Sequence, residues 1–207
     1  MTIQLEGIGK RFLYDWIFRN IDLSFSVGAY AILGHNGSGK STLMKVLSGQ
    51  LTPSAGKILF TDAAQQQLDN DLIYKSISYA APYIELIEEF TLEEHLLFHN
   101  QFKPFYAGLS IEAVKDILKL AGTKGKFIKY YSSGMKQRLK LALACCSDTP
   151  ILLLDEPTTN LDRQGVDWYQ ALVSGYAKDR IAIVASNVEA DYFFCTDKVY
   201  LPDYKKK

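Results

Sequence analysis

Short runs of alternating apolar and polar residues mark the first sixty positions of the chain. The alternation is clearest at Ile21, Leu23, Phe25 and Val27, where every second side chain is apolar, as in a half-buried strand. Runs of this kind predict strands over residues 2–6, 21–27, 30–34 and 57–61. The N-terminal part of the chain is therefore predicted to carry several short strands.

A helical pattern first appears after the third of these strands. Residues 39–49 have helical spacing and end at Gly49, and Pro53 lies beyond them as a stop. A further short strand is predicted at 76–80. From about residue 88 to residue 147 the pattern is mainly helical.

The segment 88–147 carries three helix signals. Thr91, with Glu94 three residues later, forms a capping-box pattern at the start of the first helix. Ser110 precedes a second helical run, which is predicted to end at Gly122. A third helix is predicted over the residues that follow Ser132.

Strands and helices alternate in the last third of the chain. Residues 151–155 (ILLLD) form a continuous apolar run, which is typical of a strand in a sheet covered on both faces. A helix is predicted at about 163–177, and strands at 181–185 and 198–202. This alternation predicts a mainly parallel α/β sheet. We expect one domain, 1–207, with a core of 1–87 and 148–207 and an inserted helical lobe at about 88–147.

The composition narrows the class of protein. The chain has 207 residues, 48% of them hydrophobic, which is enough for a sizeable core. Lys plus Arg and Asp plus Glu are both 23, so no nucleic-acid partner is expected. No apolar run approaches the roughly 20 residues that span a bilayer, and the N-terminus has no signal-peptide core. We therefore expect a cytoplasmic protein.

The three cysteines agree with a reducing compartment. Cys145 and Cys146 lie in an apolar helical pattern with Leu139, Ala142 and Leu143. No CxxC or histidine cluster accompanies them, so they are interpreted as small core residues rather than as a redox or metal pair.

The sequence GHNGSGKS fits the phosphate-loop pattern G-x-x-x-x-G-K-[ST], and it lies between a predicted strand and a predicted helix. Its glycines let successive backbone N–H groups face a phosphate, and the helix N-terminus adds a favourable dipole. The Lys40 side chain is expected to reach the β- and γ-phosphates, and the Ser41 hydroxyl to hold Mg²⁺. The predicted ATP-binding residues here are Gly34, His35, Asn36, Gly37, Ser38, Gly39, Lys40, Ser41 and Thr42.

Two carboxylates follow the apolar strand at 151–155. Asp155 ends this strand, and it lies close to the phosphate loop if the strands before the two segments are neighbours. There it is expected to hold Mg²⁺. Glu156 is the adjacent carboxylate and a candidate general base for an attacking water.

The phosphate loop, YSSGMKQR at 131–138 and LLLDEPTTNLD at 152–162 follow one another in the order typical of ATP-binding-cassette (ABC) proteins. YSSGMKQR resembles the signature L-S-G-G-Q-x-Q-R of that family: Ser132, Gly134, Gln137 and Arg138 match, and Ser133 replaces a glycine. The resemblance implies a P-loop NTPase core with a mainly parallel sheet, an N-terminal antiparallel β subdomain and an inserted helical lobe.

The resemblance also implies partners. Members of this family bind ATP and Mg²⁺ between two cassettes packed head to tail, so Ser132, Ser133 and Gly134 would face the nucleotide of a second cassette. Asp162 would help to position that site. An aromatic residue near the N-terminus would stack on adenine: Phe12 matches best by position, with Tyr14 and Trp16 as rivals.

For an ABC transporter, the resemblance implies an integral membrane subunit that docks near Tyr83–Phe90, and a peripheral place on the inner face of the cell membrane. Ile84, Leu86, Ile87 and Phe90 are apolar anchors for a short partner helix, or alternatively part of the protein's own core. The other functional readings are a soluble cassette that acts on ribosomes or DNA, and a non-hydrolysing ATP-binding partner in a heteromeric pair.

Two positions depart from the family pattern. Pro82 stands where the family has a glutamine, and proline has neither a side-chain donor nor a backbone N–H. Tyr83 is next to it, but using it needs a shift of one residue. Asn187 stands where the family has a histidine that reaches the γ-phosphate; its amide can donate a hydrogen bond but cannot become cationic. We therefore expect ATP binding with slow turnover.

Overall fold

Two β-sheets form the framework of the computed structural model, which describes residues 1–64, 66–120 and 122–205. The smaller sheet is antiparallel, with the order β2-β1-β4. The larger sheet is parallel, with the order β5-β6-β7-β3-β8. The strands are β1 (Thr2–Phe12), β2 (Asp15–Phe25), β3 (Gly28–Leu33), β4 (Ala55–Thr61), β5 (Ile77–Ala80), β6 (Ile151–Asp155), β7 (Ile181–Ala185) and β8 (Asp197–Tyr200).

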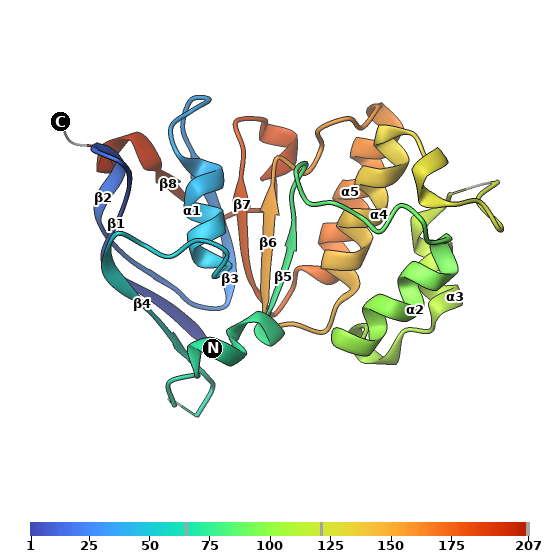
Figure 1. The fold of residues 1–207 in the computed structure, drawn as a ribbon, viewed down its shortest axis with the longest axis horizontal. Helices are drawn as coiled ribbons and strands as arrows, with labels where there is room; N and C mark the ends of the chain where they lie inside the picture. Colours follow the sequence, from blue (N-terminus) through green and yellow to red (C-terminus); the bar gives the residue numbers. More distant parts are fainter. Residues whose placement is uncertain (65, 121, 206–207) are drawn as a thin grey trace.

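Helices flank the parallel sheet on both sides. Helix α1 lies between the two sheets, whereas α2 to α5 lie on the far side of β5 and β6 in the view of Figure 1. Helix α4 packs on β5 and β6, and α5 packs on α4. The helices are α1 (Lys40–Leu47), α2 (Leu92–Phe102), α3 (Ile111–Leu118), α4 (Ser133–Cys146) and α5 (Arg163–Tyr176).

The apolar strand β6 is buried on both faces, as its sequence predicts. Ile151 and Leu153 join a core cluster with α1 and the antiparallel sheet, whereas Leu152 and Leu154 join a second cluster with α4 and α5. Successive side chains of a strand point to opposite faces, so one strand contributes to two cores. Cys145 and Cys146 are fully buried in the second cluster, which confirms that they are core residues.

The N-terminal hairpin is longer than the alternation of residue types predicts. Strand β1 reaches Phe12 and β2 begins at Asp15, six residues before the predicted start. The pairing of β1 with β2 shifts register three times. Such bulges break the period-two pattern, so cross-strand pairing rather than alternation defines these strands.

The helical segment agrees with its capping signals at the start but not at every end. Thr91 and Glu94 form the predicted capping box. Helix α3 begins after the predicted cap Ser110, but it ends at Leu118 and not at Gly122. Lys119 itself takes the left-handed conformation that ends the helix, with φ 50°. The division into a core and a lobe at about 88–147 stays a prediction.

In the part of the chain that the structure describes, no helix combines the length and the apolar composition needed to cross a bilayer.

Candidate functional site

The phosphate loop connects β3 to α1 at the carboxyl edge of the parallel sheet (Figure 1). Gly39 is the N-cap of α1 and has φ 102°. A Cβ atom there would lie 2.4 Å from Ile17 Cγ2, so only glycine fits this turn. The backbone N–H groups at the start of α1 have no partners within the helix, and they form a natural anion site.

The Lys40 ammonium lies inside this loop. Its Nζ donates to the backbone oxygen of Gly34 at 2.6 Å and to that of His35 at 3.4 Å. Burial lowers the pKa of Lys40, while the nearby carboxylates of Glu156 and Asp155 act in the opposite direction. Among the described residues, both hydrogen-bond acceptors of this cation are neutral carbonyls, so a phosphate would be a stronger partner.

One pocket of about 210 Å³ joins the loop to Glu156. The pocket is lined by residues of the loop and of α1, by Ile17 of β2 and by Glu156, which follows β6. The lining residues are Ile17, Asn36, Gly37, Gly39, Lys40, Ser41, Thr42 and Glu156. The structure thus brings together most of the predicted phosphate-loop residues and the predicted general base.

The two predicted carboxylates differ in their surroundings. Asp155 ends β6 and is buried; burial raises its pKa, and the nearby hydroxyls of Ser41 and Tyr83 act in the opposite direction. Glu156 is only half-buried and has φ 43°, a left-handed conformation that is uncommon for a residue with a side chain. Its backbone N–H donates to Ala185 of β7 at 2.9 Å, which holds this turn against the sheet.

The strand before the carboxylates is not a neighbour of the strand before the phosphate loop. Strand β7 lies between β6 and β3, so these two strands are not neighbours. The site forms nevertheless, because the carboxyl ends of parallel strands all lie at one edge.

Asn187 follows β7 and therefore lies between the loop and the carboxylates. Its Nδ2 donates to Oδ1 of Asn36 at 3.1 Å. The structure thus places this amide against the phosphate loop. His35 is exposed, and its Nδ1 pairs with the backbone oxygen of Asn36 at 2.9 Å.

A magnesium site is implied by Ser41 and Asp155. Asp155 Oδ1 is buried and has no hydrogen-bond partner among the described residues. A buried carboxylate oxygen without a donor is costly, and carboxylate and hydroxyl oxygens are the ligands that Mg²⁺ takes. The residues present therefore fit this metal.

The predicted signature residues start α4. The Ser132 side chain is the N-cap and accepts from the Met135 backbone at 3.2 Å. A Cβ atom on Gly134 would lie 3.0 Å from the backbone oxygen of Asn160. Ser132, Ser133 and Gly134 are absent from the lining of the phosphate-loop pocket, as far as the described residues show.

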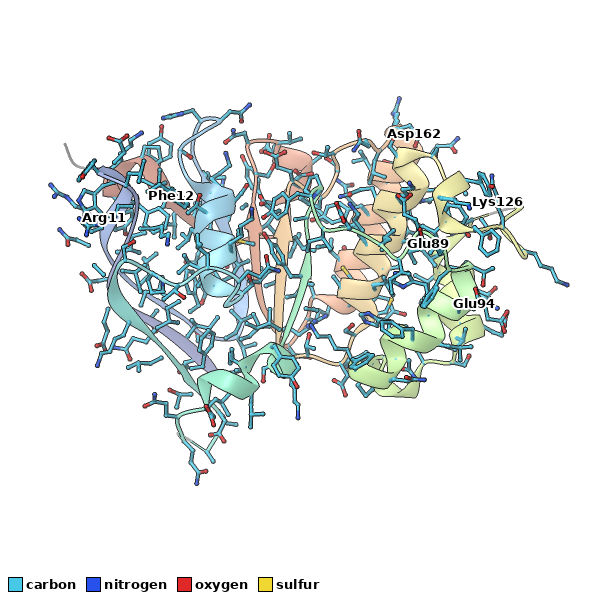
Figure 2. All side chains as sticks on the ribbon, viewed as in Figure 1. Arg11, Phe12, Glu89, Glu94, Lys126 and Asp162 are labelled. Carbon is cyan, nitrogen blue, oxygen red and sulfur yellow. The ribbon has the colours of Figure 1, made fainter. Side chains whose placement is uncertain are left out.

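Asp162 caps the start of α5, where its Oδ1 accepts from the Gly165 backbone at 2.7 Å. Figure 2 shows Asp162 at the upper edge of the molecule, beside the first turn of α4. The signature residues and Asp162 thus lie at the same edge of the parallel sheet as the phosphate loop, but on the opposite side of the sheet from the loop (Figure 1).

The adenine-stacking residue stays a prediction. Phe12 is 50% exposed and Tyr14 is 92% exposed. Within the described part of the chain, Ile17 is the residue of β2 that lines the pocket, and Phe12, Tyr14 and Trp16 do not line it. Sequence reasoning missed Ile17, because an isolated aliphatic residue in a strand carries no signal for a binding site.

Tyr83, next to Pro82, is a further residue at the site. Its hydroxyl donates to Asp155 Oδ2 at 2.9 Å. Pro82, at the family's glutamine position, offers only its carbonyl, which accepts from Lys140 Nζ at 2.6 Å. The side chain one residue after the proline is the one that reaches the carboxylate.

The sequence and the fold are similar to those of known proteins. A family model described as "ABC transporter" matches residues 18–159. A relative from Pyrococcus furiosus, named "Putative ABC transporter ATP-binding protein", is 32% identical over 208 residues, which cover 95% of this chain and 79% of the relative. An uncharacterized ABC transporter ATP-binding protein of Bacillus subtilis is 32% identical over 183 residues, 86% of this chain and 58% of the relative.

The chain spans only part of several relatives, for example 10% of the mouse ATP-binding cassette sub-family A member 17, at 32% identity over 78% of this chain. A dimeric bacterial ABC transporter cassette has a similar fold, with a TM-score of 0.78 at 20% identity, over 97% of this chain and 95% of that one. Together, the fold and the site define an ATP-binding cassette. The chain belongs to the ABC transporter family.

Proposed function

We propose that the chain binds and hydrolyses ATP as a subunit of an ABC transporter, on the inner face of the membrane. The observation that carries this proposal is one pocket that joins Lys40 and Ser41 to Glu156. Phosphates bind to the backbone N–H groups of the loop and to the Lys40 ammonium. Glu156 accepts a proton from the attacking water, and the Asn187 amide donates to the transferred phosphate.

Ser41 and Asp155 are the residues that would hold Mg²⁺, which when bound neutralises charge on the phosphates. Asp155 is suited to this role because one of its oxygens has no other partner among the described residues. Glu156 is less buried, so it stays accessible to water.

A second cassette is part of the proposal. The signature residues Ser132–Gly134 start a helix at the same edge of the sheet as the phosphate loop, but they are not among the residues that line its pocket. A head-to-tail partner would supply its signature to this pocket and receive Ser132–Gly134 at its own. An ATP-binding cassette in a dimeric post-hydrolysis state, bound to ADP and Pi, has a similar fold, with a TM-score of 0.77 at 19% identity over 97% of this chain and 95% of that one.

Turnover of Mg-ATP by the purified chain is expected to rise with protein concentration, because hydrolysis requires two cassettes. We expect a rate below the roughly 10 s⁻¹ of a typical enzyme, since Asn187 cannot carry charge and Pro82 has no side-chain donor. Steady-state phosphate release measures the rate, and excess EDTA is the control. A rate per chain that is independent of concentration would contradict pairing. Tight ATP binding without turnover at any concentration would favour the non-hydrolysing partner in a heteromeric pair.

A groove beside Tyr83 is the proposed docking surface for the membrane subunit. It has a volume of about 480 Å³ and lies between the segment after β5 and helix α4. Its lining residues are Pro82, Tyr83, Ile84, Glu85, Leu86, Glu88, Lys136 and Lys140. Leu86 and Phe90 pack against the core cluster under α4, so their apolar surface serves the fold. Ile84 lies in neither core cluster and lines the groove, which makes it the better candidate anchor.

Replacing Ile84 with Glu is expected to weaken assembly with the membrane subunit at least tenfold and to leave ATP binding unchanged. A charge in place of this apolar side chain loses roughly 1–3 kcal/mol of contact with the partner and adds a desolvation cost. Co-purification of the tagged chain with integral membrane protein measures assembly, and Val27→Glu, at an exposed apolar residue elsewhere, is the control. Unchanged assembly would exclude this groove, and co-purification with ribosomes or DNA would favour a soluble cassette.

A further inference from the structure

A pair of tyrosines lies beside the carboxylate of Asp155. The Tyr83 hydroxyl donates to Asp155 Oδ2 at 2.9 Å, and the Tyr79 hydroxyl forms a hydrogen bond with the Tyr83 hydroxyl. Tyr79 belongs to β5 and pairs with Leu153 of β6. The pair thus reaches Asp155 from the carboxyl end of the adjacent strand.

Helix α1 holds Tyr83 from another side. Lys45 Nζ lies 4.2 Å from the centroid of the Tyr83 ring, a cation–π distance. Ser41 lies four residues earlier, on the same face of the helix. Burial raises the pKa of Tyr83 and of Asp155, and the Ser41 hydroxyl is close enough to both to act in the opposite direction. Tyr83 is therefore fixed by the strand that precedes it, by α1 and by the carboxylate.

The two tyrosine hydroxyls are hydrogen-bond donors and not negatively charged ligands. The ordinary pKa of a phenol is about 10, so each hydroxyl keeps its proton at neutral pH and can donate a hydrogen bond. A neutral phenol is a weak ligand for a hard cation, which prefers carboxylates, carbonyls and water.

The contact with Tyr83 leaves half of the carboxylate available. Tyr83 donates to Oδ2, whereas Oδ1 is buried without a hydrogen-bond partner among the described residues. A donor on one oxygen limits rotation of the carboxyl group and so fixes the position of the other oxygen. Donors in this supporting position are worth about 10–100-fold in metal affinity.

We propose that Tyr83 is a positioning residue of the magnesium site, whose hydroxyl orients the Asp155 carboxylate while Tyr79 orients that hydroxyl. The inference rests on the proposed function, because Mg²⁺ is expected here together with a bound nucleotide. In this arrangement the segment after β5 contributes the Tyr83 side chain to the metal site, although Pro82 in the same segment has no donor.

The test measures how tightly the full chain binds Mn²⁺ in the presence of ADP, with the protein in excess over ADP. Mn²⁺ is a paramagnetic substitute for Mg²⁺. Electron paramagnetic resonance of free Mn²⁺ measures binding without any turnover. We expect Tyr83→Phe to weaken Mn²⁺ binding by about 10–100-fold. Tyr79→Phe should weaken it by a smaller factor, since it removes only the support of the first hydroxyl.

Two controls separate positioning from damage. Phenylalanine at 83 keeps the ring that Lys45 contacts, so ADP binding in EDTA should stay unchanged. Tyr74→Phe, at a tyrosine that is 53% exposed, should leave Mn²⁺ binding unchanged.

Unchanged Mn²⁺ affinity in Tyr83→Phe, with normal ADP binding, would overturn the inference and leave the proposed function standing. Tighter Mn²⁺ binding would also overturn it, because the hydroxyl would then compete with the metal. If the unmodified chain binds neither ADP nor ATP, the proposed function fails first and the inference falls with it.

Discussion

Replacing Glu156 with Gln is expected to lower Mg-ATP turnover by 10²–10⁴-fold, or roughly 3–5 kcal/mol of transition-state stabilisation. The amide has the size of the carboxylate but cannot accept a proton from the attacking water. Glu156 lines the pocket with Lys40 and Ser41, so the lost group lies beside the phosphate loop. The turn that positions it is fixed by a backbone hydrogen bond to Ala185, which the substitution does not touch.

The substitution should separate binding from chemistry. ATP affinity should change little, because Lys40 and the loop backbone remain, and ATP-bound dimers should last longer in light scattering after gel filtration. Single-turnover phosphate release measures the chemical step directly. Glu112→Gln, at an exposed carboxylate on α3, is the matched control and should hydrolyse ATP at the original rate. Turnover of Glu156→Gln within tenfold of the unmodified chain would show that another group acts as the base.

The residues that the sequence predicts well are those whose roles depend on near neighbours in the chain. The phosphate loop, the caps at Thr91 and Ser110 and the apolar strand at 151–155 are local patterns, and the structure has each of them. Local spacing carries enough information there because a turn, a cap or a buried strand is specified by a few consecutive residues.

What the sequence could not predict depends on contacts between distant segments. The order of the parallel sheet puts β7 between β6 and β3, and no pattern along the chain encodes this order. Tyr83 meets a carboxylate 72 residues later in the chain. The family's glutamine matches position 82 by motif, but the side chain that reaches the carboxylate is the one at position 83. The turn after β5 that presents this next residue cannot be recognised from residue types.

Arg180 is a further case of a contact that residue order does not show. Arginine side chains are mostly exposed in folded proteins, but Arg180, which precedes strand β7, is only 5% exposed. Its Nη1 donates to the backbone oxygens of Cys145 at 2.9 Å and Tyr176 at 3.1 Å. Its Nη2 donates to Ser78 Oγ at 2.8 Å and Thr149 Oγ1 at 2.6 Å.

These contacts provide partners for both terminal nitrogens of the buried guanidinium, whereas its Nε has no hydrogen-bond partner among the described residues. Cys145 and Tyr176 lie in the last turns of α4 and α5, whose final carbonyls have no partner within the helix. The negative ends of two helix dipoles therefore face one cation. Burial lowers the pKa of Arg180, but arginine stays charged far above neutral pH. Arg180 thus joins two helices to the strand β5.

Replacing Arg180 with Met is expected to lower the free energy of unfolding by about 2–6 kcal/mol. Met fills the space of the aliphatic stem but leaves the carbonyls of Cys145 and Tyr176 without this donor, and each buried unsatisfied acceptor costs about 1–3 kcal/mol. The hydroxyls of Ser78 and Thr149 still bond to each other at 2.9 Å, so they add little. The loss is large beside a total stability of about 5–15 kcal/mol for a typical domain.

Urea unfolding followed by tryptophan fluorescence measures this loss as a lower midpoint at an unchanged slope. Arg163→Met, at an exposed arginine that starts α5, is the matched control and should stay within about 0.5 kcal/mol of the unmodified chain. Arg180→Lys should lie between the two, because an ammonium group is too compact to reach acceptors on two helices and a strand at once. A loss below about 1 kcal/mol in Arg180→Met would mean that water replaces the guanidinium at the two carbonyls, and that α4, α5 and β5 are held together by their apolar contacts alone.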